Sequence, residues 1–297
     1  MKTSLLNNVS LASKTTFRIG GPARFFAKPS GIDEIQECLA WARQSGEPVF
    51  ILGKGSNVLI SDDGWPGLVI DTGAAFDAIT WEDDRAVCLS GAALGRLVRE
   101  MIDRKLRGLE YLAGIPGSVG GALIMNAGAY GHVVTECVES VDYYDFATET
   151  IATLSVERLE AGYRRTVFSD KRAFVISGRF CFVADPAAEA GEIVRQCGAK
   201  RKEKHPLDLP NCGSVFKNLP GNISAASLIE KSGLKGFRIG NAEVSRKHAN
   251  FIVNLGGATA ADVVGIIKHV QKTVQKEQGI LLEPEVVMVG KINESSR

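Results

Sequence analysis

The chain has 297 residues, 45% of them hydrophobic, and a formal net charge of +1. This length suits two domains or one large one, and the even balance of charges argues against a broad basic surface for nucleic acid or acidic membranes. One exception is the basic run AKRKEKHP at residues 199–206, which we interpret as the solvated end of a helix.

The six cysteines and four histidines lie far apart, with no CxxC pair and no closely spaced pair of histidines. This spacing argues against a disulfide framework and against a metal site. The first 14 residues lack the continuous apolar core of a signal peptide, and no later apolar run reaches the length of a membrane span. We therefore expect a cytoplasmic, monomeric protein with reduced thiols and no metal.

The first predicted element is a helix over residues 32–45, capped by Ser30 and ended by Gly46, with apolar residues recurring on one face. Short strands are predicted after it, at residues 48–52, 58–60, 68–73, 76–82 and 86–91. A second helix is expected at residues 94–106, because its leucines, valine and methionine recur at helical spacing.

Two long strands, 136–146 and 174–185, follow this helix. Helices are predicted at 186–204, 224–234 and 258–279, strands around 242–255, and a closing strand at 280–290. The last of these helices carries one apolar stripe, formed by Val263, Ile266, Ile267, Val270 and Val274. This order predicts two regions of α+β character, joined near residues 185–190.

Two glycine clusters stand out, GKGSN from Gly53 to Asn57 and a longer segment from Gly114 to Gly131 that holds six glycines. Glycines let other atoms approach the backbone closely, and bare N–H groups bind anionic oxygens. Neither cluster fits the dinucleotide-binding fingerprint G-x-G-x-x-G or the P-loop. Each cluster alone fits tight turns between strands equally well, but two such clusters favour a dinucleotide held between two loops.

Three motifs resemble the FAD-binding domain of the vanillyl-alcohol-oxidase (PCMH) type: TTFRIGGPARFF from Thr15, GKGSNVLISD from Gly53 and AGIPGSVGGALIMNAGAYG from Ala113. Four more resemble the UDP-N-acetylenolpyruvylglucosamine reductase (MurB) family in the same order. These are GYRRTVF from Gly162, NCGSVFKN from Asn211, NAEVSRKHANFIVN from Asn241 and LEPEV from Leu282. The resemblance covers nearly the whole chain.

This resemblance implies an α+β fold with an N-terminal arm at 1–14, a two-lobed FAD-binding domain at 15–185 and a C-terminal α+β substrate-binding domain at 190–297. It also implies NADPH-dependent, FAD-mediated reduction of UDP-N-acetylglucosamine enolpyruvate to UDP-N-acetylmuramate, a step of peptidoglycan precursor synthesis. The chain resembles the compact members of the family, which lack a tyrosine-bearing insertion.

By the same resemblance, hydride passes from flavin N5 to C3 of the substrate, Ser214 gives a proton to C2, and Arg164 and Glu285 stabilise the reacting centre. Periodicity alone does not separate Glu285 from Glu283, which would share a face of the strand. The implied cofactor contacts are Gly53, Gly55, Ser56, Asn57, Gly114, Gly117, Ser118, Gly121, Asn126 and Gly128. The implied substrate contacts are Tyr163, Lys217, Asn218, Lys247, His248 and Asn250.

Two alternatives stay open at this point. One is an FAD oxidase of the same fold that acts on another substrate, although its relatives would lack the NCGSVFKN and LEPEV motifs. The other is a flavin-free protein that binds a UDP-sugar. The intact glycine clusters argue against the second, because a protein without the cofactor would not need them.

Overall fold

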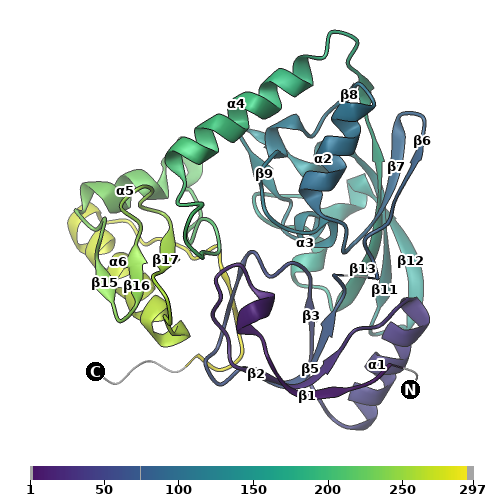
Figure 1. Ribbon diagram of the computed structural model, residues 1–297, viewed down its shortest axis with the longest axis horizontal. Coiled ribbons are helices and arrows are strands. Elements are labelled where there is room, and N and C mark those ends of the chain that lie inside the picture. Colours follow the sequence, from purple (N-terminus) through teal and green to yellow (C-terminus); the bar gives the residue numbers. More distant parts are fainter. Residues whose placement is uncertain (1–2, 74, 293–297) are drawn as a thin grey trace.

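The computed structural model describes residues 3–73 and 75–292. Two larger sheets lie next to each other, and a small sheet with two helices forms the opposite end of the molecule (Figure 1). The architecture is thus α+β, as the sequence predicts.

The first sheet has the strand order β1-β2-β5-β3, in which only the edge strand β1 runs antiparallel to its neighbour. Its strands are β1 (Leu6–Ser10), β2 (Pro22–Ala27), β3 (Val49–Leu52) and β5 (Trp65–Asp71). Helix α1 (Ile32–Gln44) packs Ile35 and Cys38 into the core of this region. The predicted cap is wrong by one residue: Gly31 occupies the N-cap, and the Ser30 hydroxyl donates to Glu34 at 2.7 Å.

The second sheet is antiparallel throughout, with the order β12-β11-β13-β7-β6. Its strands are β6 (Ile79–Glu82), β7 (Arg85–Leu89), β11 (Val138–Asp145), β12 (Thr150–Ser155) and β13 (Ala173–Cys181). Helices α2 (Leu94–Asp103) and α3 (Val119–Ile124) share its buried core. Sequence reasoning missed β12, which is polar and largely exposed, and α3, which lies inside the glycine-rich segment.

Short pairs of strands complete this region. They are β9 (Gly128–Ala129) with β10 (His132–Val133), and β8 (Leu106–Arg107) with β14 (Val183–Ala184). Tyr144 and Phe174 of the second sheet are buried in the same cluster as α1, so the two sheets share a core.

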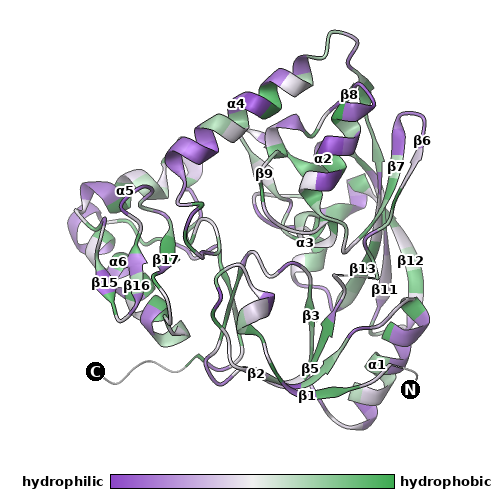
Figure 2. Cartoon of the chain, in the orientation of Figure 1, coloured by the Kyte–Doolittle hydropathy of each residue, from purple (hydrophilic) through white to green (hydrophobic). Residues whose placement is uncertain are grey.

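Helix α4 (Glu189–Lys204) connects the second sheet to the C-terminal part (Figure 1). It begins at Glu189 and not at Pro186, because the Asp185 carboxylate accepts the backbone N–H groups of Glu189 and Ala190 at 3.1 and 2.9 Å. Figure 2 shows mostly hydrophilic residues along α4, in contrast to the hydrophobic strands β3 and β5 of the first sheet. Only Ala190 and Cys197 are buried on this helix.

The C-terminal part consists of α5 (Ala225–Lys231), α6 (Ala260–Gln278) and the sheet β15 (Arg238–Ile239), β16 (Ala242–Val244) and β17 (Ile252–Asn254). The predicted apolar stripe of α6 is buried in its core, which confirms that element.

The chain then returns to its first third. Strand β18 (Val287–Val289) pairs in parallel with β4 (Val58–Ile60), and the rest of the predicted strand 280–290 is extended chain with one bridge, Phe216 to Pro284. This return places Glu285 at the boundary between the N-terminal and C-terminal parts.

Candidate active site

A largely buried ion pair joins two segments that are 121 residues apart. The Nε of Arg164 donates to Glu285 Oε1 at 2.8 Å, and its terminal nitrogen donates to the carbonyl of Gly128 at 2.8 Å. Only 19% of the Arg164 side chain and 14% of the Glu285 side chain are exposed. The structure therefore brings two of the three predicted catalytic residues into direct contact.

Burial and charge act in opposite directions on Glu285. Burial raises the pKa of this carboxyl, while the positive charge and hydrogen bond of Arg164 lower it by less, so that the pKa of Glu285 lies above its ordinary value. The Glu285 backbone is held on both sides: its N–H donates to Val215 O at 2.7 Å, and its carbonyl accepts from the Asn57 side chain at 3.2 Å.

Ser214 directly precedes Val215 and is partly buried. Its hydroxyl has no hydrogen-bond partner within the described residues. Asn250, 3% exposed, fixes the loop beside it, because its amide accepts from Phe216 N at 2.9 Å and donates to Phe216 O at 2.8 Å. The Asn250 amide therefore holds this loop, and its expected contact with the substrate stays a prediction.

The two glycine clusters lie against each other. A Cβ at Gly53 would be 2.6 Å from Ser118 Oγ, and one at Gly117 would be 3.1 Å from Ser56 Oγ. Ser56 itself donates to the carbonyl of Pro116 at 2.9 Å. Among the described residues, no acceptor is found for the backbone N–H groups of Ser56, Gly117 and Ser118. Such a surface suits anionic oxygens.

Other glycines have packing reasons. A Cβ at Gly55 (φ +61°) would be 2.3 Å from Lys14 O, one at Gly128 would be 2.5 Å from His132 O, and one at Gly114 would be 3.0 Å from the Cδ of Arg201. Gly121 belongs to α3, and its N–H donates to the N-cap Ser118 at 3.3 Å. Packing within the fold therefore explains in part why residues 114–131 contain so many glycines.

Two predicted cofactor contacts, both asparagines, hold the site together. The Asn126 amide is buried; it donates to Gly162 O at 3.0 Å and accepts from the Thr135 hydroxyl at 2.9 Å. It thus supports the turn that carries Arg164. Asn57 holds the chain that follows Glu285 at two points: its side chain donates to the Glu285 carbonyl, and its own carbonyl accepts from Val287 N at 3.0 Å.

Tyr163 and Asn218 are neighbours beside the ion pair. The Asn218 N–H donates to the Tyr163 hydroxyl at 3.2 Å, and the Arg164 guanidinium carbon is 5.1 Å from the centre of the Tyr163 ring. Lys217 forms an ion pair with Glu283, whose side chain is 70% exposed. Glu283 and Glu285, inseparable by periodicity, are thus distinguished by burial and by partner.

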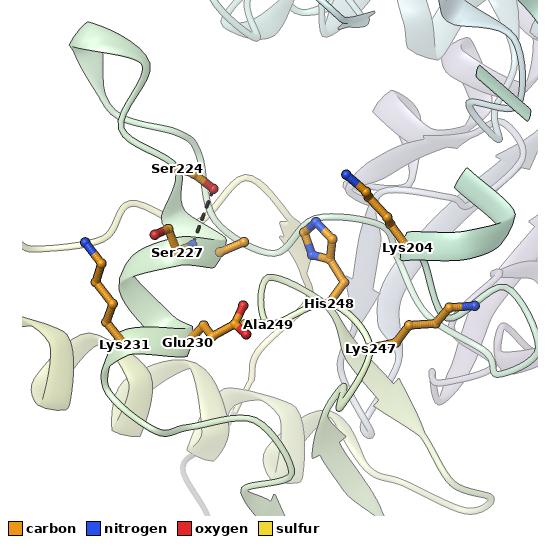
Figure 3. Close-up of a pocket in the computed structure, with 9 residues that line it drawn as sticks. Lys204, Ser224, Ser227, Glu230, Lys231, Lys247, His248 and Ala249 are labelled. Atoms are coloured by element: carbon orange, nitrogen blue, oxygen red, sulfur yellow. Dashed lines mark hydrogen bonds between the residues drawn. The ribbon is translucent and has the colours of Figure 1, made fainter. Parts of the chain in front are cut away.

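A hollow of about 470 Å³ opens between α5 and the end of α4 (Figure 3). Lys204 and His248 face Ser224 and Ser227 across it, and Lys247 also lines it. Burial lowers the pKa of His248, whose ring lies 5.2 Å from that of His205. Sequence reasoning named Lys247 and His248 but missed Lys204, which we interpreted as part of a solvated helix end.

Within residues 3–73 and 75–292, no group of three His, Cys, Asp or Glu residues could hold a metal ion. No helix in the same part of the chain has both the length and the apolar character needed to cross a membrane.

Two family models match the chain. The FAD binding domain matches residues 23–155, and the C-terminal domain of UDP-N-acetylenolpyruvoylglucosamine reductase matches residues 205–289. The reductase of that name from Exiguobacterium sibiricum is 43% identical over 289 residues, which cover 97% of this chain and 94% of the relative. The chain belongs to the UDP-N-acetylenolpyruvoylglucosamine reductase family.

Other relatives agree. The reductase of the same name from Prochlorococcus marinus is 43% identical over 95% of this chain and 92% of its own length. The crystal structure of the MurB reductase from Thermus caldophilus superposes with a TM-score of 0.83 at 33% identity, covering 97% of this chain and all of that one. The chain is thus an FAD-dependent oxidoreductase of the MurB family, whose reductant is NADPH, and its PCMH-type fold is confirmed.

Proposed function

We propose that the enzyme reduces UDP-N-acetylglucosamine enolpyruvate to UDP-N-acetylmuramate, with Arg164, Glu285 and Ser214 around the reacting carbons. The observation that carries this assignment is the buried Arg164–Glu285 pair beside the loop of Ser214. Family membership supports the reaction. It places the enzyme in peptidoglycan precursor synthesis.

The two adjoining glycine loops would hold the cofactor. Residues 53–57 and 114–118 bring unpaired backbone N–H groups together, and the absence of a side chain at Gly117 keeps the surface open. Bound FAD supplies the hydride chemistry of the reaction. The protein's task is to hold FAD and substrate and to manage charge and protons.

Arg164 is suited to grip the substrate carboxylate as negative charge develops on it. Two of its N–H groups are used by Glu285 and Gly128, and the guanidinium fork carries five. Its backbone φ is +56°, which is rare outside glycine and is typical of residues whose position is fixed by their surroundings. The two internal hydrogen bonds fix the fork before substrate arrives, so its orientation costs little during the reaction.

Nearby charge would determine whether Glu285 is ionised during the reaction. Burial raises its pKa, so this carboxyl takes up a proton more readily than an exposed glutamate. Its contact with Arg164 would let it polarise the same centre that the arginine binds.

The hollow of Figure 3 would take the nucleotide part of the substrate. Lys204, Lys231 and Lys247 line it, together with the hydroxyl groups of Ser224 and Ser227. Cations and hydroxyl donors of this kind suit a diphosphate and a sugar. Tyr163 and Asn218 lie between the ion pair and the first turn of α5, since Asn218 also accepts from Ala225 N at 3.1 Å.

Ser214→Ala tests the assignment of the proton donor. Because the hydroxyl has no internal partner, its loss should leave the fold and the reduction of bound flavin by NADPH unchanged. Loss of a general acid costs about 10²–10⁴-fold, so reoxidation of the reduced enzyme by the enolpyruvyl substrate should slow by that factor. Stopped-flow absorbance of the flavin follows each half-reaction separately.

Ser13→Ala, at an exposed serine outside the site, is the control. If Ser214→Ala slowed both half-reactions equally, Ser214 would have a structural role and the assignment would be wrong.

A further inference from the structure

Arg201, in the last turn of α4, is partly buried, and the Nε of its guanidinium has no hydrogen-bond partner. Its Nε is shielded from solvent and makes no hydrogen bond, and the residue forms no ion pair with any carboxylate of the described chain. Burial is the main influence on this guanidinium and lowers its pKa. Buried polar groups in proteins are hydrogen-bonded as a rule, so a buried N–H without a partner calls for an explanation.

The surroundings of Arg201 belong to the glycine-rich segment. A Cβ atom on Gly114 would be only 3.0 Å from the Cδ of Arg201, so a larger residue at position 114 would crowd the arginine. On another side the guanidinium carbon is 5.8 Å from the centre of the Tyr130 ring. Gly114 and Tyr130, the two residues of this segment that Arg201 contacts, both have positive φ, +77° and +55°.

A helix end alone does not account for this arrangement. Lys202 and Lys204 share the last turn of α4, are exposed, and can interact with the helix dipole from the solvent. Arg201 gains the same interaction but also loses water from its Nε. Besides burial, Tyr130 and Cys197 influence the pKa of Arg201, and both raise it by less than burial lowers it.

We propose that Arg201 binds a phosphate oxygen of a diphosphate that lies on the Gly114–Gly117 loop. The proposal rests on the proposed placement of the cofactor on this loop. Two ligands of the reaction have the required chemistry, the diphosphate of FAD and that of the nucleotide sugar. Arginine suits the site better than lysine, because its planar fork can bind two phosphate oxygens at once and is more weakly hydrated.

A ligand-binding role and a structural role for Arg201 predict opposite effects of its removal on the melting temperature of the flavin-free protein. Arg201→Met keeps an aliphatic chain against Gly114 but removes the charge. Without ligand, removal of a partly buried charge that has no carboxylate partner should leave the melting temperature of flavin-free protein unchanged or higher. Ligand binding should become about ten- to a hundredfold weaker, as expected for a lost charged hydrogen bond.

The experiment compares wild type, Arg201→Met, Arg201→Lys and the control Lys200→Met. Lys200 is exposed and lies 6.0 Å from the same Tyr130 ring, so the control removes a neighbouring charge with no burial. Flavin-free protein is titrated with FAD by fluorescence quenching, and holoenzyme is titrated with UDP by the change in flavin absorbance. Melting temperatures are recorded with and without inorganic pyrophosphate.

Weaker binding of FAD by Arg201→Met assigns the arginine to the cofactor, and weaker binding of UDP assigns it to the substrate. In both cases Arg201→Lys should be intermediate and Lys200→Met close to wild type. Pyrophosphate should raise the melting temperature of flavin-free wild type more than that of Arg201→Lys, a comparison that holds even where Arg201→Met does not fold.

Unchanged affinities of Arg201→Met for both ligands would overturn the proposal. If the melting temperature of the flavin-free variant were also lower, Arg201 would have a structural role. The absorption spectrum of the purified wild type shows whether it contains flavin, and this separates failure of the Arg201 proposal from failure of the proposed function. A wild type that neither contains nor takes up FAD contradicts the proposed function itself.

Discussion

Two features of its surroundings act in opposite directions on the charge of Glu285. Its burial favours the neutral acid, and its contact with Arg164 favours the carboxylate, with burial the larger effect. The folded protein therefore binds a proton at this residue more tightly than the unfolded chain does. The free energy of unfolding therefore depends on pH.

Between the ordinary glutamate pKa of 4.5 and the higher pKa of Glu285, the folded state binds more protons than the unfolded state. The wild type should therefore lose stability as the pH rises through this interval. Glu285→Gln cannot ionise, so its stability relative to wild type should increase from pH 4 to pH 7, while turnover falls. Urea unfolding at both values measures this difference.

Arg164 loses its charged partner in Glu285→Gln, which shifts the stability of the variant by an offset that depends little on pH. Glu283→Gln, two residues away at an exposed carboxylate, is the matched control for removing a negative charge from the same segment. If the wild type instead became more stable relative to Glu285→Gln as the pH rises, the ion pair with Arg164 would outweigh burial in setting the Glu285 pKa.

The individual residues of the site show where sequence reasoning stops. Arg164 and Arg165 are adjacent and chemically identical, and only the fold turns one inward to Glu285 and leaves the other paired with Asp170 at the surface. Arg201 belongs to a basic run that is typical of a solvated helix end, and only the contact with Gly114 reveals its burial. Burial and partner are tertiary properties, so composition and spacing do not contain them.

Helix α6 shows how an element can depend on a distant part of the chain. Its first turn is capped locally by Thr259, which accepts from Asp262 N at 3.0 Å. Asp62, in the loop after β4, accepts from Ala260 N and Ala261 N at 2.8 and 3.1 Å. A carboxylate from the N-terminal part thus satisfies two of the free N–H groups of a C-terminal helix and meets its positive end.

Asp62→Ala should therefore destabilise the protein by about 1–2 kcal/mol, the typical effect of removing a capping side chain. Thr259→Ala removes the local cap and is the matched comparison, with a loss of about 1 kcal/mol. Urea unfolding followed by circular dichroism measures both. If only Thr259→Ala lowered the stability, the contact across the two parts would not contribute to the helix.

Elements were predictable where one periodic signal was strong. The stripe of α6 and the apolar positions of α2 are buried as expected. Segments such as α3 gave no such signal, because its glycines and small residues suggest turns, although Ser118 provides an N-cap. Likewise, β12 is held by pairing with β11 on the exposed edge of a sheet, and pairing of this kind leaves little trace in hydrophobicity.

At the scale of the molecule, the first and last thirds of the chain share a core. Phe17, Ile19 and Leu59 of the N-terminal part are buried in the same cluster as α5 and α6. Strand β18 pairs with β4, and Asn57, directly before β4, binds the backbone of Glu285 and Val287. The candidate active site lies at this junction, so its geometry depends on the contact between the two parts.

Leu59→Ala tests this contact. Leu59 is fully buried on β4, opposite Met288 of β18, and its truncation should cost about 2–5 kcal/mol. Because its contacts belong to the C-terminal core, flavin release and loss of helix should shift together to lower urea concentrations. Leu207→Ala, at a leucine that is 60% exposed, should change the stability by no more than about 0.5 kcal/mol. Two separate transitions in the wild type, one for flavin and one for helix, would show that the parts unfold independently despite their shared core.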